Sequence, residues 1–197
     1  MTHLRSCACV FVLGSAAGFA QGSGTCAAPF SAPLRAGIAL TIESRSGEVD
    51  VMGSDRDGVR VTCTLDDTDR AKDVRIELER SGDFGKLRLR GGPTNNVRIR
   101  IELPRRTDLK LRVPAGEVRI DQVSGDKDIS LSAGEITVSH VNGAEYRSVK
   151  ASVDVGAVNA TEFGVGKGGF FRSFTRDSAG GLYRLRAHLI SGNVQLN

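Results

Sequence analysis

The stretch Ala115-Gly116-Glu117-Val118-Arg119-Ile120 recurs 18 residues later as Ala133-Gly134-Glu135-Ile136-Thr137-Val138. Looser copies of this stretch begin at Ser46, Lys150 and Ser191. A fixed period near 18 residues, with short strands in each period, is typical of a β-solenoid. Its coils stack and share one core, because no coil can bury its apolar face alone.

Outward from this repeat, apolar and polar residues alternate along most of the chain. The alternating runs include Ile38–Ile42, Val59–Leu65, Val74–Leu78, Val97–Leu103, Leu109–Val113, Ile129–Leu131 and Val194–Leu196. Period-2 alternation places one face of a strand in the core and the other in water. No stretch of ten or more residues has a helical period. We therefore predict an all-β fold, a β-solenoid with coils of about 18 residues; a β-sandwich is the alternative, because short strands at close spacing suit it too.

The motif [SA]-G-[EN]-[VI]-x-[VIL], the stretch IRIELPRRTDLKLRVPAGEVRI (Ile99–Ile120) and the closing SGNVQL (Ser191–Leu196) resemble the bacterial putative-adhesin family of unknown-function domains. The resemblance extends over Ile38–Asn197. It implies a single-stranded, right-handed parallel β-helix that is exported or membrane-tethered. The family name implies adhesion, and the family supplies no agreed catalytic residues. The insert Phe163–Gly181 departs from the family pattern and leaves the number of coils open.

The first twenty residues predict a secretory signal peptide. His3 and Arg5 precede the apolar run Cys7–Phe19, and small residues stand at Gly18 and Ala20. The run is shorter than the roughly 20 apolar residues that a spanning helix needs, and no later segment qualifies. We therefore predict export to the periplasm, the cell surface or the medium. The expected organisation is a signal peptide over 1–20, a flexible lead-in over 21–35 and the adhesin-like domain over 36–197.

Two of the four cysteines, Cys7 and Cys9, would leave with the signal peptide. Cys26 and Cys63 would remain in a compartment where disulfides persist, so a bridge between them is one option. Their spacing alone does not establish it. Two isolated cysteines without a CxxC motif do not predict a metal site.

Composition narrows the class of partner. The 197 residues are 25% charged and carry a net charge of +4, far from a histone-like polycation. Export and the lack of aromatic residues interleaved with basic ones argue against nucleic acid. The predicted partner is therefore a cell-envelope polysaccharide or a protein.

A basic stripe is the strongest local charge bias. Arg98 and Arg100 alternate with apolar residues along one predicted strand, and Lys110 and Arg112 do so along the next. Such a stripe suits the phosphate or carboxylate groups of a surface polymer. The alternative is that these charges only discourage aggregation of strand edges.

No catalytic signature is complete. Gly164–Gly169 satisfies GxGxxG, but no helix opening follows it, and His140 and His188 stand alone. Glu117 and Glu135 occupy equivalent repeat positions and could form a carboxylate pair or two solvated turns. The Asp-rich segments starting at Asp55, Asp66 and Asp126 fit no calcium loop. We predict no cofactor, no metal and no enzyme.

Half of the eight phenylalanines, Phe163, Phe170, Phe171 and Phe174, lie in the Gly-rich insert. They either cap the open end of the core or offer an apolar contact to a partner. The predicted function is an exported, non-enzymatic adhesin-like or structural binding domain. Two alternatives stay open: a lyase or hydrolase acting on polysaccharide, and a repeat domain that signals envelope stress.

Overall fold

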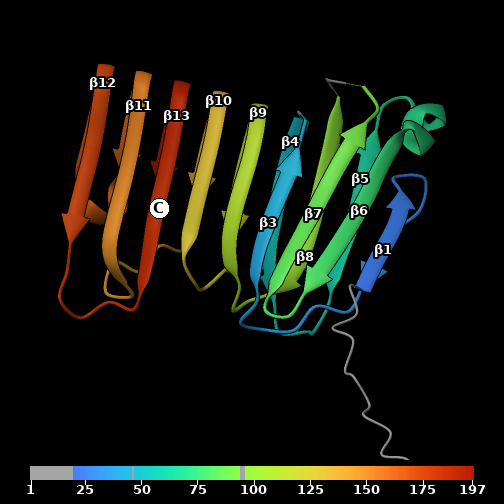
Figure 1. Cartoon of the computed structure of the whole chain (residues 1–197). Helices are drawn as coiled ribbons and strands as arrows, with labels where there is room; N and C mark the ends of the chain where they lie inside the picture. Colours follow the sequence, from blue (N-terminus) through green and yellow to red (C-terminus); the bar gives the residue numbers. More distant parts are fainter. Residues whose placement is uncertain (1–19, 46, 94–95) are drawn as a thin grey trace, which may run out of the picture.

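The computed structural model describes residues 20–45, 47–93 and 96–197, so the expected signal peptide lies outside the described residues except for Ala20. The prediction of an all-β fold is confirmed (Figure 1). The strands are β1 (Ala20–Thr25), β2 (Phe30–Ala32), β3 (Ala39–Ser44), β4 (Gly47–Ser54), β5 (Val59–Leu65), β6 (Val74–Ser81), β7 (Phe84–Gly91), β8 (Val97–Pro104), β9 (Asp108–Asp121), β10 (Lys127–Val138), β11 (Tyr146–Ala160), β12 (Val165–Asp177) and β13 (Tyr183–Leu196). Two short 3₁₀ helices, η1 (Thr68–Asp73) and η2 (Thr161–Phe163), complete the described elements. Over these residues, neither helix has the length and apolar character needed to cross a bilayer.

Strands β9, β10, β11 and β13 each have two arms that meet at a glycine. We call the part before this corner glycine the first arm and the part after it the second arm. In β9 the corner is Gly116: β3 pairs with the first arm, and β4 pairs with the second arm. Inward side chains of both arms, such as Leu111 and Ile120, belong to one hydrophobic core. The strands therefore form two layers over a shared core, and the layers are continuous through the corners.

The corner glycines form a column through the sheet. Gly47, Gly116, Gly134, Gly192 and Gly156 are successive register partners. Their φ angles lie between +106° and +140°, a conformation that side chains with a Cβ rarely adopt. A Cβ on Gly134 would lie 1.7 Å from the carbonyl oxygen of Gly116. Each corner can therefore stack directly on the next only because it carries no side chain.

The order of the strands differs from the order of the repeats in the chain. Strands β9, β10, β13, β11 and β12 lie side by side (Figure 1), so the last strand of the chain inserts between β10 and β11. The copy beginning at Ser191 is thus an inner member of the stack rather than an outlying one. The third copy also has a different register from the expected one, because its corner is Gly156 rather than a residue near Ala151. After β10 the chain leaves one strand position of the sheet open and forms β11 beyond it. It then turns back as the antiparallel strand β12, and β13 finally occupies the open position between β10 and β11.

The segment 21–35, expected to be a flexible lead-in, carries strands in the structure. β1 pairs antiparallel with β6, and β2 pairs antiparallel with β5. Phe30 in β2 is buried against β1, where a Cβ on Gly24 would lie 2.9 Å from its ring. The small residues of this segment therefore leave space for the buried ring of Phe30, which packs the segment against the sheet.

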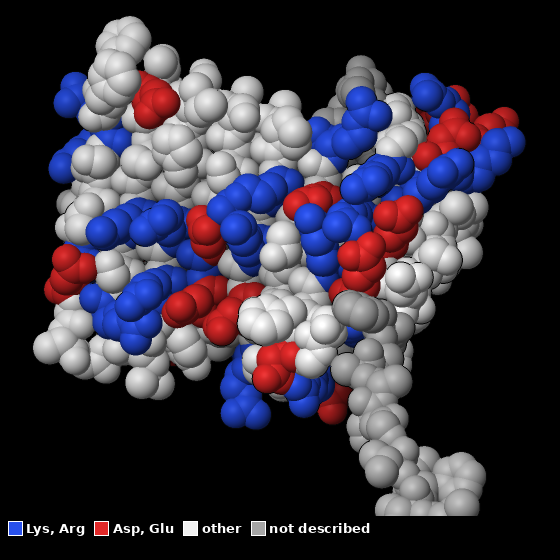
Figure 2. Space-filling model, in the orientation of Figure 1, with Lys and Arg blue, Asp and Glu red and all other residues white. Residues whose placement is uncertain are grey.

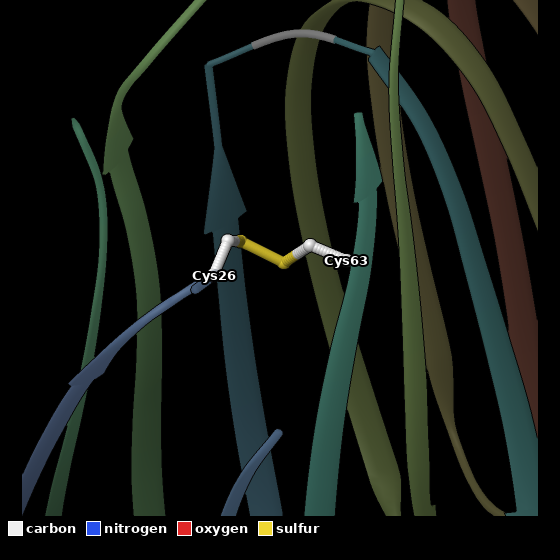
Figure 3. Close-up of a disulfide and its surroundings, with 2 residues drawn as sticks. All are labelled: Cys26 and Cys63. Atoms are coloured by element: carbon white, nitrogen blue, oxygen red, sulfur yellow. A yellow bond between two sulfur atoms is a disulfide. The ribbon is translucent and has the colours of Figure 1, made fainter. Parts of the chain in front are cut away.

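A disulfide joins Cys26 and Cys63 (Figure 3). Cys26 directly follows β1, which belongs to the layer of β6 and β7, whereas Cys63 lies in β5, next to β8 in the other layer. The bridge therefore ties the two layers together at the end of the sheet formed by the N-terminal strands.

β12 covers the opposite end of the core. Phe174 is buried, and its ring centroid lies 5.2 Å from that of the partly buried Phe163. Phe170 and Phe171 are 69% and 81% exposed at the bend of the strand. The insert therefore divides its phenylalanines: two cover the end of the core, and two face solvent.

Candidate binding face

The corner glycines set a common register for the outward side chains of the first arms. One set of these side chains lies six positions before each corner and continues onto the partner residues of β7 and β12. We call this set the charged row: Lys86, Thr41, Lys110, Asp128, Arg186, Lys150 and Thr175. Residues four positions before each corner of the long strands, with their partner on β12, form the hydroxyl row: Arg112, Ser130, His188, Ser152 and Ser173. Neighbouring members of a row lie on adjacent strands, about 4.8 Å apart. Figure 2 shows the basic and acidic side chains in bands across this face.

Ion pairs neutralise only part of this face. Lys86 pairs with Glu43 at 2.7 Å, and this bond lowers the pKa of the Glu43 carboxyl. Arg112 pairs with Asp128, also at 2.7 Å. Lys110, Arg186 and Lys150 are exposed and form no ion pair within the described part of the chain. Three cations of the charged row are therefore available to an external anion.

An aromatic hollow of about 690 Å³ lies at the start of the first arms. Phe84, which is 70% exposed, stands on its wall beside Lys86 and Lys110. Acidic side chains line the same hollow: Glu79, Asp108, Asp126 and Asp128. An exposed ring next to acceptors and donors can contact the face of a sugar while the polar groups bind its hydroxyls.

A polar hollow of about 520 Å³ adjoins it and shares Asp128 and Arg186 with it. Lys150 and Arg186 lie on neighbouring strands in this hollow. Hydroxyls from three strands also line it: Ser130, Ser152, Ser173 and Thr175. The two hollows together make a continuous depression that extends from β6 to β12.

The basic stripe expected from the sequence is divided between the two layers. Arg98 and Arg100 lie on β8, which pairs with β4 and β5, whereas Lys110 and Arg112 lie on the first arm of β9. Arg98 is also bound to Glu48 at 2.7 Å, and Arg100 lies 4.0 Å from Glu102. Of the four predicted residues, only Lys110 and Arg112 belong to the candidate face.

Glu117 and Glu135 are register partners, as the repeat implied, but each is engaged by a neighbour. Arg119 binds Glu117 and Glu48, and Gln195 donates a hydrogen bond to Glu135 at 2.5 Å. Burial opposes ionisation of Glu48, but hydrogen bonds from Arg98 and Arg119 leave its pKa below the ordinary value. Glu117 therefore pairs within β9 and Glu135 accepts a hydrogen bond from β13, whereas Glu48 forms the ion pairs that join strands of the second layer.

The remaining candidates also have local partners. Gly164–Gly169 runs from the end of η2 into β12, which pairs with β11, so no helix N-terminus follows it. His140 Nδ1 lies 2.5 Å from Asp121 Oδ1, and His188 Nδ1 lies 3.0 Å from Ser152 Oγ. In the Asp-rich segments, Asp55 pairs with Arg105, Asp67 caps η1, and Asp126 accepts the backbone N–H of Arg184.

Lys127 is a buried cation at the edge of the aromatic hollow. Its register neighbours are Leu109 and Leu185, and its side chain is only 3% exposed. The ammonium donates to the Tyr146 hydroxyl at 2.5 Å and to the carbonyl of Gly125 at 3.3 Å. Burial lowers the pKa of Lys127 to about 8, because the charged form loses its hydration.

We expect Lys127→Met to raise the free energy of unfolding at pH 7 by about 1–3 kcal/mol, because the substitution removes a buried charge and places an apolar side chain between Leu109 and Leu185. The folded pKa of Lys127, about 8, is below the unfolded value of 10.5. The unfolded chain therefore binds more protons between these values, and this lysine makes wild-type stability rise with pH across that window.

Urea unfolding from pH 7 to pH 10.5 tests this expectation. The advantage of the variant should shrink as the pH rises, whereas Lys110→Gln, a change at an exposed lysine, should show no such trend. An advantage independent of pH would contradict the assignment to a buried charge.

The fold of the chain is similar to that of a solved structure, a putative cell adhesion protein from Clostridium sporogenes. The two share 14% sequence identity, and the TM-score is 0.53. The match covers 86% of this chain and 98% of that chain. No protein-family model and no curated protein matches the sequence. At this identity the likeness concerns the fold alone.

Lys86, Lys150 and Arg186 were not predicted from the sequence to share one surface. The signal for two of them is present in the chain, because Lys150 and Arg186 each stand six residues before a corner glycine, as Lys110 does. Lys86 has no such marker, since β7 contains no corner and joins the row only by pairing with β3.

Proposed function

We propose that the chain is an exported, non-enzymatic adhesin-like domain that binds an anionic cell-envelope polysaccharide across the charged row. The observation that carries the proposal is the row itself. Lys110, Arg186 and Lys150 form no ion pair within the described residues and lie on parallel strands of one face, and the first two line the hollow that carries the exposed ring of Phe84. A linear polymer lying perpendicular to the strands would meet these groups in succession.

Export and the class of fold belong to the same proposal. The expected signal peptide and a disulfide, which is typical of oxidising compartments, support export. The stacked corners and the parallel first and second arms support a solenoid for β9–β13, ending on a more sandwich-like N-terminal part. The solved structure with a similar fold is described as a putative cell adhesion protein, which agrees with a binding domain.

The proposal is tested by co-sedimentation of the purified chain with envelope polysaccharide at low and high salt. We expect binding that falls at high salt, because the contacts are exposed charges, and no release of new sugar ends. The variant Lys110→Gln/Arg186→Gln should weaken binding about tenfold or more, since hydrogen bonds to charged groups contribute about 1.5–3 kcal/mol each.

The matched control is Arg60→Gln/Arg100→Gln, which removes the same charge from the other layer. It should bind as the wild type does. Equal losses in the two variants would show that net charge alone drives binding, and released sugar ends would contradict a non-enzymatic role.

A further inference from the structure

We propose that the polar hollow is a subsite for a tetrahedral oxyanion ester, a sulfate or phosphate group carried by the polymer, while the adjoining aromatic hollow holds its sugar ring. This inference rests on the proposed function and specifies the chemistry of its ligand. It follows from the different side chains that line the two hollows on one face.

The polar hollow offers donors without a free competing acceptor. Lys150 and Arg186 are exposed register partners on β11 and β13. The carboxylate of the hollow, Asp128, is occupied by the guanidinium of Arg112 at 2.7 Å. An anion entering the hollow therefore meets two uncompensated cations on adjacent strands.

Hydroxyl groups lie next to these cations, two residues further along the strands. Ser152 and Ser173 are register partners on β11 and β12, one pleat repeat along from Lys150 and Thr175. His188 lies between Ser130 and Ser152 and contacts the latter through Nδ1 at 3.0 Å. Donors thus approach the hollow from two rows and several strands.

A tetrahedral group fits this arrangement better than a planar carboxylate does. A phosphate or sulfate ester presents three oxygens in different directions, so it can accept from both rows at once. A carboxylate presents two oxygens in one plane and would leave part of the donor set unused. The aromatic hollow differs, because four carboxylates stand among its basic side chains and partly offset their attraction for such an anion.

The test compares dextran sulfate with carboxymethyl dextran of the same chain length and charge density, using unmodified dextran as the uncharged reference. The two charged polymers differ only in the anionic group. We expect the purified full chain to bind dextran sulfate about tenfold more tightly than carboxymethyl dextran in titration calorimetry, and dextran weakly or not at all. Polyphosphate should compete with dextran sulfate, which identifies the shared tetrahedral chemistry.

Two variants locate the preference. Ser152→Ala/Ser173→Ala should reduce the preference for sulfate to near unity while leaving the weaker carboxymethyl binding unchanged. The control Ser132→Ala/Ser191→Ala removes two exposed hydroxyls at the corners, outside the hollow, and should keep the full preference.

The outcomes separate this inference from the proposed function. Equal affinity for the two charged dextrans overturns the oxyanion subsite and leaves a general polyanion surface. A preference that survives Ser152→Ala/Ser173→Ala overturns the placement in the polar hollow. Failure of both charged dextrans and of envelope polysaccharide to bind overturns the proposed function together with the inference.

Discussion

Gly134→Ala is expected to lower the free energy of unfolding by about 4 kcal/mol or more, the largest effect of any single substitution considered for this chain. Two costs add up at this corner. The φ of +128° strains any residue with a Cβ, by about 1–3 kcal/mol. In addition, the new methyl carbon would lie 1.7 Å from the carbonyl oxygen of Gly116, so the two stacked corners must separate.

Separation of the corners has consequences beyond the corner itself. β10 pairs with β9 on one side and with β13 on the other, through both arms. A shift of Gly134 therefore disturbs two parallel ladders and the apolar rows beneath them, including Ile129 and Ile136, which are fully buried. We expect a chain that is largely unfolded or aggregated rather than a folded one with a local defect.

The measurement is urea unfolding followed by far-ultraviolet circular dichroism, because the chain contains no tryptophan. Gly82→Ala is the matched control: its φ is +57°, but no atom lies within 4 Å of the new methyl group. It should cost only about 1–2 kcal/mol, the conformational part alone. If Gly134→Ala costs no more than Gly82→Ala, the corners do not stack as described.

The double variant Cys26→Ser/Cys63→Ser is expected to lower the free energy of unfolding by about 4 kcal/mol. The bridge closes a loop with a sequence separation of 37 residues, and the chain-entropy model gives roughly this value for such a loop. The structural reason is also specific: the bridge ties β1, on one layer, to β5 on the other. Without it, β1 and β2 are held by antiparallel edge pairing and by the buried ring of Phe30.

Reduction of the wild type provides the control for this prediction. Dithiothreitol should shift the wild-type urea midpoint to that of the double variant and leave the variant itself unchanged. Equal midpoints for the oxidised wild type and the double variant would show that the bridge does not constrain the unfolded chain.

The amino-acid sequence by itself determined that the fold is all-β and where four of the five corners lie, while the corner at Gly156 was expected near Ala151. Alternation in runs such as Val97–Leu103 specifies which side chains enter the core, because successive side chains of a strand point to opposite faces. The motif glycines Gly47, Gly116, Gly134 and Gly192 mark corners that no larger residue could occupy. The repeat also brought Glu117 and Glu135 into register correctly.

Only the tertiary structure decided which strands are neighbours. Period-2 patterns assign a face to each residue but not a partner to each strand, since every edge presents the same backbone donors and acceptors. The insertion of β13 between β10 and β11 therefore left no local signal, and it is this insertion that places Arg186 beside Lys150. For the same reason Arg98 and Lys110, close in the sequence, lie in different layers: the chain between them passes from a strand of one layer to the first arm of β9 in the other.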